Sequence, residues 1–116
     1  MPSTTRYKRG DIVLVPFPFT DLSSSKRRPA LVISPDDFNA RVQDLVVAAI
    51  TSQLTDDSDA VTIQASDCTD GTLPKTSVVK LTKVFTIHST LILKRICALR
   101  SEKLETVLGT LRRFFS

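Results

Sequence analysis

Residues 9–34 have the sequence RGDIVLVPFPFTDLSSSKRRPALVIS, in which two apolar segments flank a polar loop. Residues 11–17 follow a glycine and contain an unbroken run of Ile, Val and Leu, which predicts a β-strand. Residues 29–34 predict a second strand for the same reason. The loop between them is rich in Thr, Asp and Ser and ends in three consecutive cations. We therefore expect a strand–loop–strand unit that presents positive charge at one end.

The three cations of this loop, Lys26, Arg27 and Arg28, are candidates for binding a polyanion. Arg28 precedes Pro29, and a proline disfavours the helical conformation in the residue before it, so Arg28 should be extended. Its guanidinium stays charged and offers a planar fork of donors that matches a phosphate. Taken alone, however, the triplet fits a solvated basic turn better than a phosphate site.

The rest of the chain predicts further strands. Residues 44–52 are apolar on both faces, and residues 60–64 form a shorter strand with Val61 and Ile63 on one side. More strand material is expected at residues 77–81, 84–87 and 93–99, and one helical turn at residues 35–40. Because the loops are short and no long crossover helix occurs, the connections should be antiparallel. The expected fold class is mainly β, a small antiparallel barrel.

The final segment changes to a helical period. Its apolar residues recur at helical spacing, with Ser101 as the expected N-cap, and comprise Leu104, Val107, Leu108, Leu111 and Phe115. Arg112 and Arg113 near the end complement the helix dipole. This helix should cover one face of the barrel. Strands that are apolar on both faces need more cover than one helix gives, so we expect a dimer interface to supply it.

Length and composition are those of one small domain. The 116 residues, with a net charge of +4 and a pI near 9.4, can bury a core of their own and suit a polyanionic partner. Residues 1–116 are expected to form a single domain with residues 1–8 as a loose tail. No signal peptide or membrane-spanning run is apparent, so we expect a cytoplasmic protein. Cys68 and Cys97 do not form a CxxC pair and predict neither a disulfide nor a metal site.

Several short motifs follow one another in a set order along the chain. They are Gly10-Asp11-Ile12-Val13, Phe17-Pro18, Lys26-x-Arg28-Pro29, Ala49-Ile50-Thr51-Ser52, Ser77-Val78-Val79-Lys80 and Phe85-Thr86-Ile87. Their order and spacing resemble the MazF/PemK group of toxin endoribonucleases from bacterial type II toxin–antitoxin pairs. The resemblance implies an SH3-like barrel, a homodimer, and sequence-specific cleavage of single-stranded RNA without a metal or another cofactor. The expected products are a 2′,3′-cyclic phosphate and a 5′-hydroxyl.

The resemblance also implies catalytic roles for two residues. The arginine before the proline and the threonine that ends the Ala-Ile-Thr strand match Arg28 and Thr51. Without the resemblance, Thr51 would be an ordinary β-branched strand residue. Some relatives carry a carboxylate two positions after a basic residue in the following strand, whereas this chain has Lys80-Leu81-Thr82. No general base is therefore assigned, and Lys80 is expected either to contact phosphate or to be a solvated strand residue.

Other polar and aromatic residues are candidates for contacting RNA. Phe17 and Phe19 flank the basic loop and could stack on bases, while Ser52 and Gln53 could read base edges by hydrogen bonds. His88, the single histidine, sits where a turn begins and is expected to be a capping residue rather than an acid or base. The Asp21 side chain is expected to form a hydrogen bond with the backbone of its own turn.

Two functions remain open at this point. The first is a ribonuclease toxin whose basic groove is blocked by an acidic, extended antitoxin segment. The second is a binding module on the same barrel, which captures a protein such as DNA gyrase or binds RNA without cutting it. The pair Arg28 and Thr51 distinguishes them, because only the ribonuclease needs a charge at Arg28 for catalysis.

Overall fold

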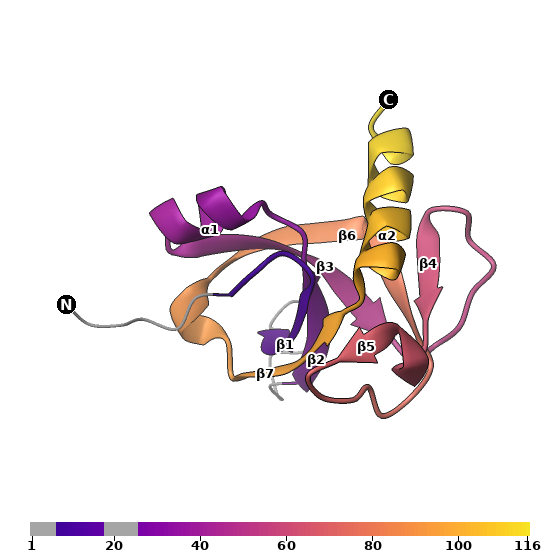
Figure 1. Cartoon of the computed structure of the whole chain (residues 1–116), viewed down its shortest axis with the longest axis horizontal. Helices are drawn as coiled ribbons and strands as arrows, with labels where there is room; N and C mark the ends of the chain where they lie inside the picture. Colours follow the sequence, from indigo (N-terminus) through magenta and orange to yellow (C-terminus); the bar gives the residue numbers. More distant parts are fainter. Residues whose placement is uncertain (1–6, 18–25) are drawn as a thin grey trace.

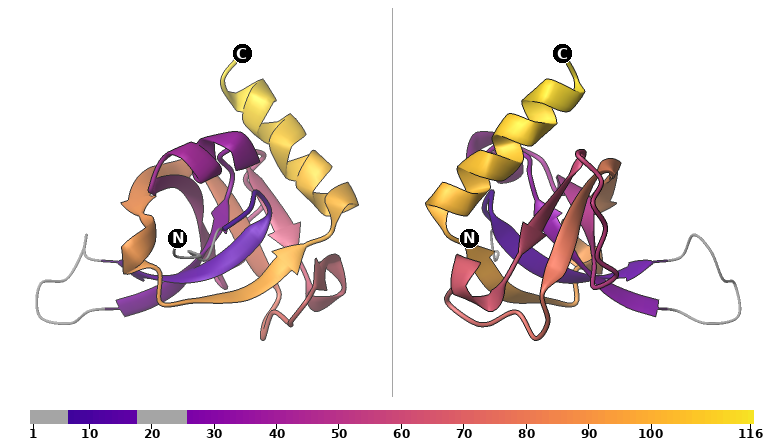
Figure 2. Two further views of the ribbon diagram at one scale, coloured as in Figure 1. Left: turned by 60° about the vertical axis from the view of Figure 1, so that its left-hand side comes forward. Right: turned by 90° about the vertical axis from the view of Figure 1, so that its right-hand side faces the viewer.

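The computed structural model describes residues 7–17 and 26–116, except for the side chains of residues 17 and 26. These residues form a seven-stranded sheet with the order β4-β6-β3-β2-β1-β7-β5, in which every neighbouring pair is antiparallel. The strands are β1 (Asp11–Phe17), β2 (Lys26–Val32), β3 (Asp44–Thr51), β4 (Ala60–Ile63), β5 (Cys68–Thr69), β6 (Ser77–His88) and β7 (Lys94–Leu99). The sheet curls into a half-barrel, as Figures 1 and 2 show, with β4 and β5 as its edges. The predicted mainly β antiparallel fold is confirmed.

Two α-helices and two short 3₁₀ turns accompany the sheet. Helix α1 (Asp36–Arg41) follows β2, and η1 (Ala65–Asp67) and η2 (Ser89–Leu91) are single turns. Helix α2 (Ser101–Phe114) packs against β4 and β6 and runs away from the barrel toward the C-terminus (Figure 1). The C-terminal helix was predicted, and it covers one face of the sheet as expected.

The core consists of two clusters on the two faces of the curled sheet. Ile12 and Leu31 belong to the larger cluster, which also contains Val107 of α2. Val13 and Val15 belong to the other. Neighbouring residues of β1 therefore face two different clusters, which explains the unbroken apolar run. β1 therefore buries residues on both of its faces within a single chain, and the expected dimer interface stays a prediction.

Several predicted boundaries are wrong. Helix α2 begins at Ser101, and its N-cap is Arg100, which makes no side-chain capping bond; the backbone N–H of Arg100 donates instead to the carbonyl oxygen of Asp67 at 2.7 Å. Phe115 lies beyond the helix and is 71% exposed, so it does not belong to the buried stripe. The short strand β5 was not predicted, because two residues carry no period.

The N-terminal segment is ordered closer to the start than predicted. Residues 1–6 lie outside the described part of the chain. Tyr7 packs against the second core cluster, and the backbone N–H of Lys8 donates to the Asp11 carboxylate at 2.9 Å. Asp11 is buried and also accepts a hydrogen bond from Arg95 at 3.0 Å. The expected tail of residues 1–8 is therefore too long by at least these two residues.

Residues 77–81 and 84–87, predicted as separate pieces, form the one strand β6, which contains an irregularity. Ala48 pairs with Val84, whereas the next residue, Ala49, pairs with Lys80. Three residues of β6 thus have no partner in β3, and we call this segment, residues 81–83, the β6 bulge. Within it, Leu81 is buried and its N–H donates to the carbonyl oxygen of Asp59 at 3.1 Å. The bulge is therefore anchored and not a frayed end.

The two cysteines are buried and free. Desolvation, helped by a hydrogen bond from the Cys97 thiol to the neighbouring Cys68, raises the pKa of Cys97 to about 12. The Cys68 thiol also donates to the carbonyl oxygen of Gln64 at 3.7 Å. The Cys97 thiol is therefore protonated at neutral pH, and burial encloses both thiols, which makes them poor nucleophiles.

We expect a thiol reagent such as Ellman's reagent to react with the native protein at pH 8 more than roughly a hundredfold slower than with the unfolded chain. In guanidinium chloride, both thiols should react rapidly. The single variants Cys68→Ala and Cys97→Ala show which thiol accounts for any residual reaction. Rapid labelling of either thiol in the native state would contradict the burial described here.

Candidate functional site

Arg28 lies within a strand and not at the end of a loop. Strand β2 begins at Lys26, three residues earlier than predicted, and Arg28 pairs with Val15 of β1. The prediction of an extended Arg28 is confirmed. Because β1 pairs with β2 from Lys26 to Leu31, the backbone of Arg28 is held more rigidly than a loop residue would be.

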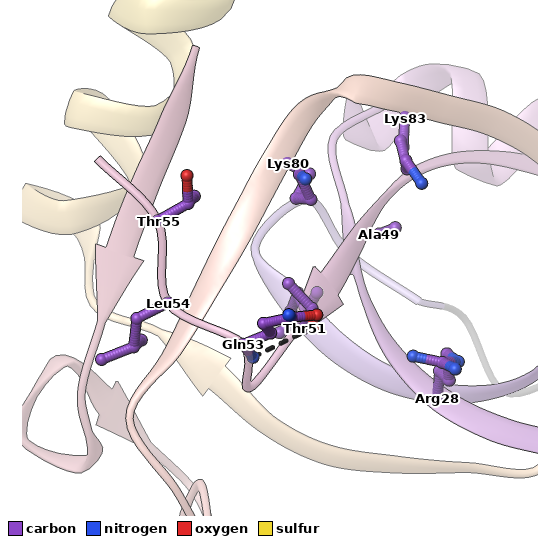
Figure 3. A pocket seen from close by; sticks show the side chains of 9 residues that line it. Arg28, Ala49, Thr51, Gln53, Leu54, Thr55, Lys80 and Lys83 are labelled. Atoms are coloured by element: carbon purple, nitrogen blue, oxygen red, sulfur yellow. Dashed lines mark hydrogen bonds between the residues drawn. The ribbon is translucent and has the colours of Figure 1, made fainter. Parts of the chain in front are cut away.

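Thr51 ends the neighbouring strand β3. The β2–β3 ladder ends where Ala30 pairs with Ala49, and the same register extended by two residues would set Arg28 opposite Thr51. The hydroxyl oxygen of Thr51 accepts a hydrogen bond from the backbone N–H of Gln53 at 3.1 Å (Figure 3). This bond orients the side chain and leaves the hydroxyl hydrogen available to a ligand.

In the described part of the chain, two pockets adjoin these residues. The first, which we call the lysine pocket, has a volume of about 460 Å³ and is lined by Arg28, Ala49, Ile50, Thr51, Gln53, Leu54, Thr55, Lys80 and Lys83 (Figure 3). The second, the proline pocket, has a volume of about 530 Å³ and is lined by Leu14, Arg27, Arg28, Pro29, Ile50, Thr51, Ser52, Leu73, Pro74, Lys75, Ser77 and Ile96. Three residues line both, namely Arg28, Ile50 and Thr51. They form the wall that the two pockets share.

All the charged residues that line the two pockets are cations. The lysine pocket contains Arg28, Lys80 and Lys83, and the proline pocket contains Arg27, Arg28 and Lys75. No aspartate or glutamate lies among the described lining residues of either pocket. Clefts lined by charges of one sign concentrate oppositely charged ligands. The arrangement suits an anion at the shared wall.

Lys83 reaches the lysine pocket through the β6 bulge. Residues three apart in a regular strand face opposite sides of a sheet, so Lys80 and Lys83 would be expected on different faces. The bulge changes this alternation, and both side chains line the same pocket (Figure 3). The sequence analysis missed Lys83 for this reason, and it also missed Lys75 because that residue lies in an irregular segment before β6.

The other predicted contact residues divide between the pockets. Gln53 and Lys80 line the lysine pocket, while Arg27 and Ser52 line the proline pocket. Phe19, together with the side chains of Phe17 and Lys26, lies outside the described residues. The backbones of Phe17 and Lys26 pair with each other at the end of the β1–β2 ladder.

The two residues that the sequence analysis set aside as acids or bases have different outcomes. His88 is the N-cap of η2, where its Nδ1 accepts a hydrogen bond from the backbone N–H of Thr90 at 3.3 Å. Its expected capping role is confirmed. Asp21 lies outside the described residues.

Within residues 7–17 and 26–116, no group of three or more His, Cys, Asp or Glu side chains could hold a metal ion. No helix of this part of the chain combines the length and the apolar character needed to span a bilayer.

Comparisons with known proteins agree with this architecture. Residues 8–115 match the family described as the PemK-like, MazF-like toxin of type II toxin–antitoxin systems. No curated protein matches by sequence. Among solved structures, MazF from Deinococcus radiodurans is 22% identical, with a TM-score of 0.77 over 97% of this chain and 98% of that one. An endoribonuclease from a mycobacterial species is 17% identical, with a TM-score of 0.76 over 97% of this chain and 93% of that one.

A mycobacterial endoribonuclease in complex with its cognate antitoxin is also similar, at 17% identity and a TM-score of 0.76 over 94% of each chain. At these identities the solved structures establish a shared fold. The family match spans nearly the whole chain and does not depend on them. The curled sheet, the C-terminal helix and this match together show that the chain belongs to the PemK-like, MazF-like family of type II toxin–antitoxin toxins.

Proposed function

We propose that this toxin is a sequence-specific, metal-independent endoribonuclease that cleaves single-stranded RNA. The observation that carries the proposal is the shared wall, where Arg28 from β2 and Thr51 from β3 meet between two pockets lined by cations. A phosphodiester is the anion that such a wall suits, since the guanidinium matches its oxygens and the pockets on either side can accept the adjoining nucleotides.

The proposed reaction is an internal transesterification. The ribose 2′-oxygen attacks the adjacent phosphorus, the bond from phosphorus to the 5′-oxygen breaks, and the 2′-hydroxyl proton is lost while the leaving oxygen gains one. The products are a 2′,3′-cyclic phosphate and a 5′-hydroxyl. Negative charge grows on the non-bridging oxygens in the transition state, and donors placed beforehand stabilise it. Arg28 and the hydroxyl of Thr51 are these donors.

The proton acceptor is not a carboxylate of the described pocket linings. In the segment Lys80-Leu81-Thr82, where some relatives carry a carboxylate, Leu81 is buried and Thr82 is exposed. The proposal therefore assigns the rate enhancement to charge stabilisation and substrate positioning. Ser52 and Gln53, one in each pocket, are proposed to form hydrogen bonds with the bases next to the cut.

We expect Thr51→Val to lower kcat about tenfold or more, because it removes the donor without changing the shape of the side chain much. Thr51→Ser keeps the hydroxyl and its acceptor role toward Gln53, so its kcat should stay close to that of the native protein. Single-turnover cleavage of one labelled RNA measures both variants. Equal rates for the Val and Ser variants would exclude a role for the hydroxyl.

The partners of the proposed enzyme follow from the same surface. An acidic, extended antitoxin segment could occupy the cation-lined pockets and compete with RNA. A structurally similar mycobacterial endoribonuclease is in complex with its cognate antitoxin, which supports an antitoxin as a partner. We also propose a homodimer, since Leu91, Leu93, Phe114 and Phe115 are exposed apolar residues on one protomer. The toxin would act in the cytoplasm, where its RNA substrate is found.

The proposal is tested by incubating the protein with mixed-sequence single-stranded RNA in excess EDTA. We expect cleavage, with new 5′-hydroxyl ends that polynucleotide kinase labels without prior phosphatase treatment. The opposite ends should be cyclic phosphates that resist phosphatase until acid opens them. Failure of the folded protein to cleave any RNA would contradict the proposal and favour the binding-module alternative.

A further inference from the structure

We propose that the two pockets divide the RNA ligand between them, which deepens and rests on the proposed function. The lysine pocket binds the backbone phosphate next to the scissile one, and the proline pocket accepts a nucleobase on the other side of the shared wall. Affinity and base preference would then reside in different residues.

The lysine pocket has the features of a phosphate site. Lys80 is half-buried and Lys83 is exposed, and in the described part of the chain neither forms an ion pair with a carboxylate. The β6 bulge that brings them together is anchored by buried Leu81 and its hydrogen bond to Asp59. Both lysine side chains therefore line the pocket before RNA binds, where an anion would offset their like charges.

The proline pocket has a different character. Its apolar side chains come from five segments of the chain and comprise Leu14, Pro29, Ile50, Leu73, Pro74 and Ile96. Its polar groups are those of Arg27, Ser52, Lys75 and Ser77, besides Arg28 and Thr51 of the shared wall. A nucleobase combines apolar faces with a polar edge and fits such a mixed lining. No aromatic residue lines the described pocket, so the base would be held between aliphatic side chains.

The pocket is also firmly built. Leu73 is only 4% exposed and belongs to the larger core cluster, which fixes the segment that carries Pro74 and Lys75. The hydroxyl of Ser77 donates to the carbonyl oxygen of Lys75 at 2.9 Å and holds the same segment from the other end. Pockets that discriminate between ligands need such support, because a loose wall adapts to any base.

Two single variants separate the two roles. Lys83→Ala removes one cation of the lysine pocket, at an exposed position where loss of the side chain should not affect folding. Leu14→Ala enlarges the proline pocket; Leu14 is half-buried, unlike its buried neighbours Val13 and Val15. Lys8→Ala removes an exposed cation outside both pockets and is the matched control, because the Lys8 contact to Asp11 uses the backbone.

Binding is measured with a fluorescent single-stranded 2′-deoxy oligonucleotide, which cannot be cleaved because it lacks the attacking hydroxyl. For Lys83→Ala, the slope of log affinity against log salt should become shallower by about 0.7, with affinity near 0.1 M salt about fivefold lower. Leu14→Ala should leave this slope unchanged, and Lys8→Ala should change it very little.

Base preference is measured by sequencing the new ends from a randomised RNA. Leu14→Ala should reduce the preference at one position beside the cut by about tenfold, while Lys83→Ala leaves the preferences unchanged. A second variant, Leu14→Phe, fills the pocket and should alter the same position. The inference is overturned if both pocket variants change both readouts, or if Leu14 substitutions leave every preference intact.

Failure of the inference differs visibly from failure of the proposed function. If the native protein cuts RNA but Lys83→Ala and Leu14→Ala affect the salt slope and the base preference alike, the protein is a ribonuclease whose pockets do not divide the RNA in this way. If the native protein cuts no RNA at all, the proposed function fails. The salt slope of Lys83→Ala on the uncleavable strand still tests the phosphate half in that case, and an unchanged slope would overturn it.

Discussion

Replacing Arg28 with alanine is expected to lower kcat for RNA cleavage by about 10²- to 10³-fold, which corresponds to about 3–4 kcal/mol of transition-state stabilisation. The guanidinium belongs to the wall shared by both pockets, where the scissile phosphate is proposed to bind. Its loss removes a donor that acts most strongly when charge grows on the phosphoryl oxygens. Single-turnover cleavage of a labelled RNA in EDTA measures the effect.

Two controls separate chemistry from folding and from general charge. Arg41→Ala removes an exposed guanidinium on α1, outside both pockets, and should retain the native rate. Arg28→Lys keeps the charge but loses the planar fork, so its rate should fall between those of the native protein and Arg28→Ala. Thermal unfolding should show that Arg28→Ala is folded. A native rate for this folded variant would refute the assignment of Arg28.

The same experiment addresses the alternative function. A binding module that captures a protein does not need Arg28 for catalysis, and a relative that binds RNA without cutting it would show affinity and no products. Cleavage that survives EDTA and is lost with Arg28→Ala would exclude both.

Replacing Gly71 with alanine is expected to lower the free energy of unfolding by roughly 2–5 kcal/mol. Gly71 has a φ of +141°, which side chains disfavour, and an added Cβ would overlap the carbonyl oxygen of Ile96 and lie 3.1 Å from the Cβ of Cys97. Backbone atoms cannot rotate away as a side chain can, so β7 or the turn after β5 must shift. Denaturation by urea, followed by circular dichroism, measures the loss.

The matched control is the same substitution in a helix. An added Cβ at Gly109, within α2, would come no closer than 4.0 Å to the end of the flexible Arg112 side chain. Gly109→Ala should therefore raise the free energy of unfolding by about 0.5–1 kcal/mol, because alanine restricts the unfolded chain and favours the helix. If Gly71→Ala were as stable as the native protein, the close approach to Ile96 would be wrong.

Since Ile96 lines the proline pocket, a folded Gly71→Ala should also change base preference.

Much of the fold was predictable because its signals are local. The apolar run of β1 and the helical spacing of α2 each depend on residues close together in the chain. The strand start at Lys26 and the N-cap at Arg100 were missed, since the first depends on pairing with β1 and the second on a hydrogen bond to distant Asp67. Local patterns do not contain either partner.

In the candidate site, too, some residues were predictable from local sequence and others depended on strand pairing. Arg28 and Thr51 were named from motifs that resemble a family, and the structure then placed both on the wall shared by the two pockets. Lys83 could not be named, because strict alternation would point it away from Lys80. The one element that brings it into the lysine pocket is the β6 bulge, held by Leu81 and Asp59.

The sequence by itself determined the types and approximate positions of the main elements, the positive charge and the resemblance to one family. These follow from side-chain chemistry and from short-range periodicity. The tertiary structure alone decided which side chains share a pocket, that β1 buries both its faces within one chain, and that the shared wall separates a basic pocket from a more apolar one. Strand register and bulges depend on pairing between segments far apart in the chain, and a shift of one residue would turn each side chain to the opposite face.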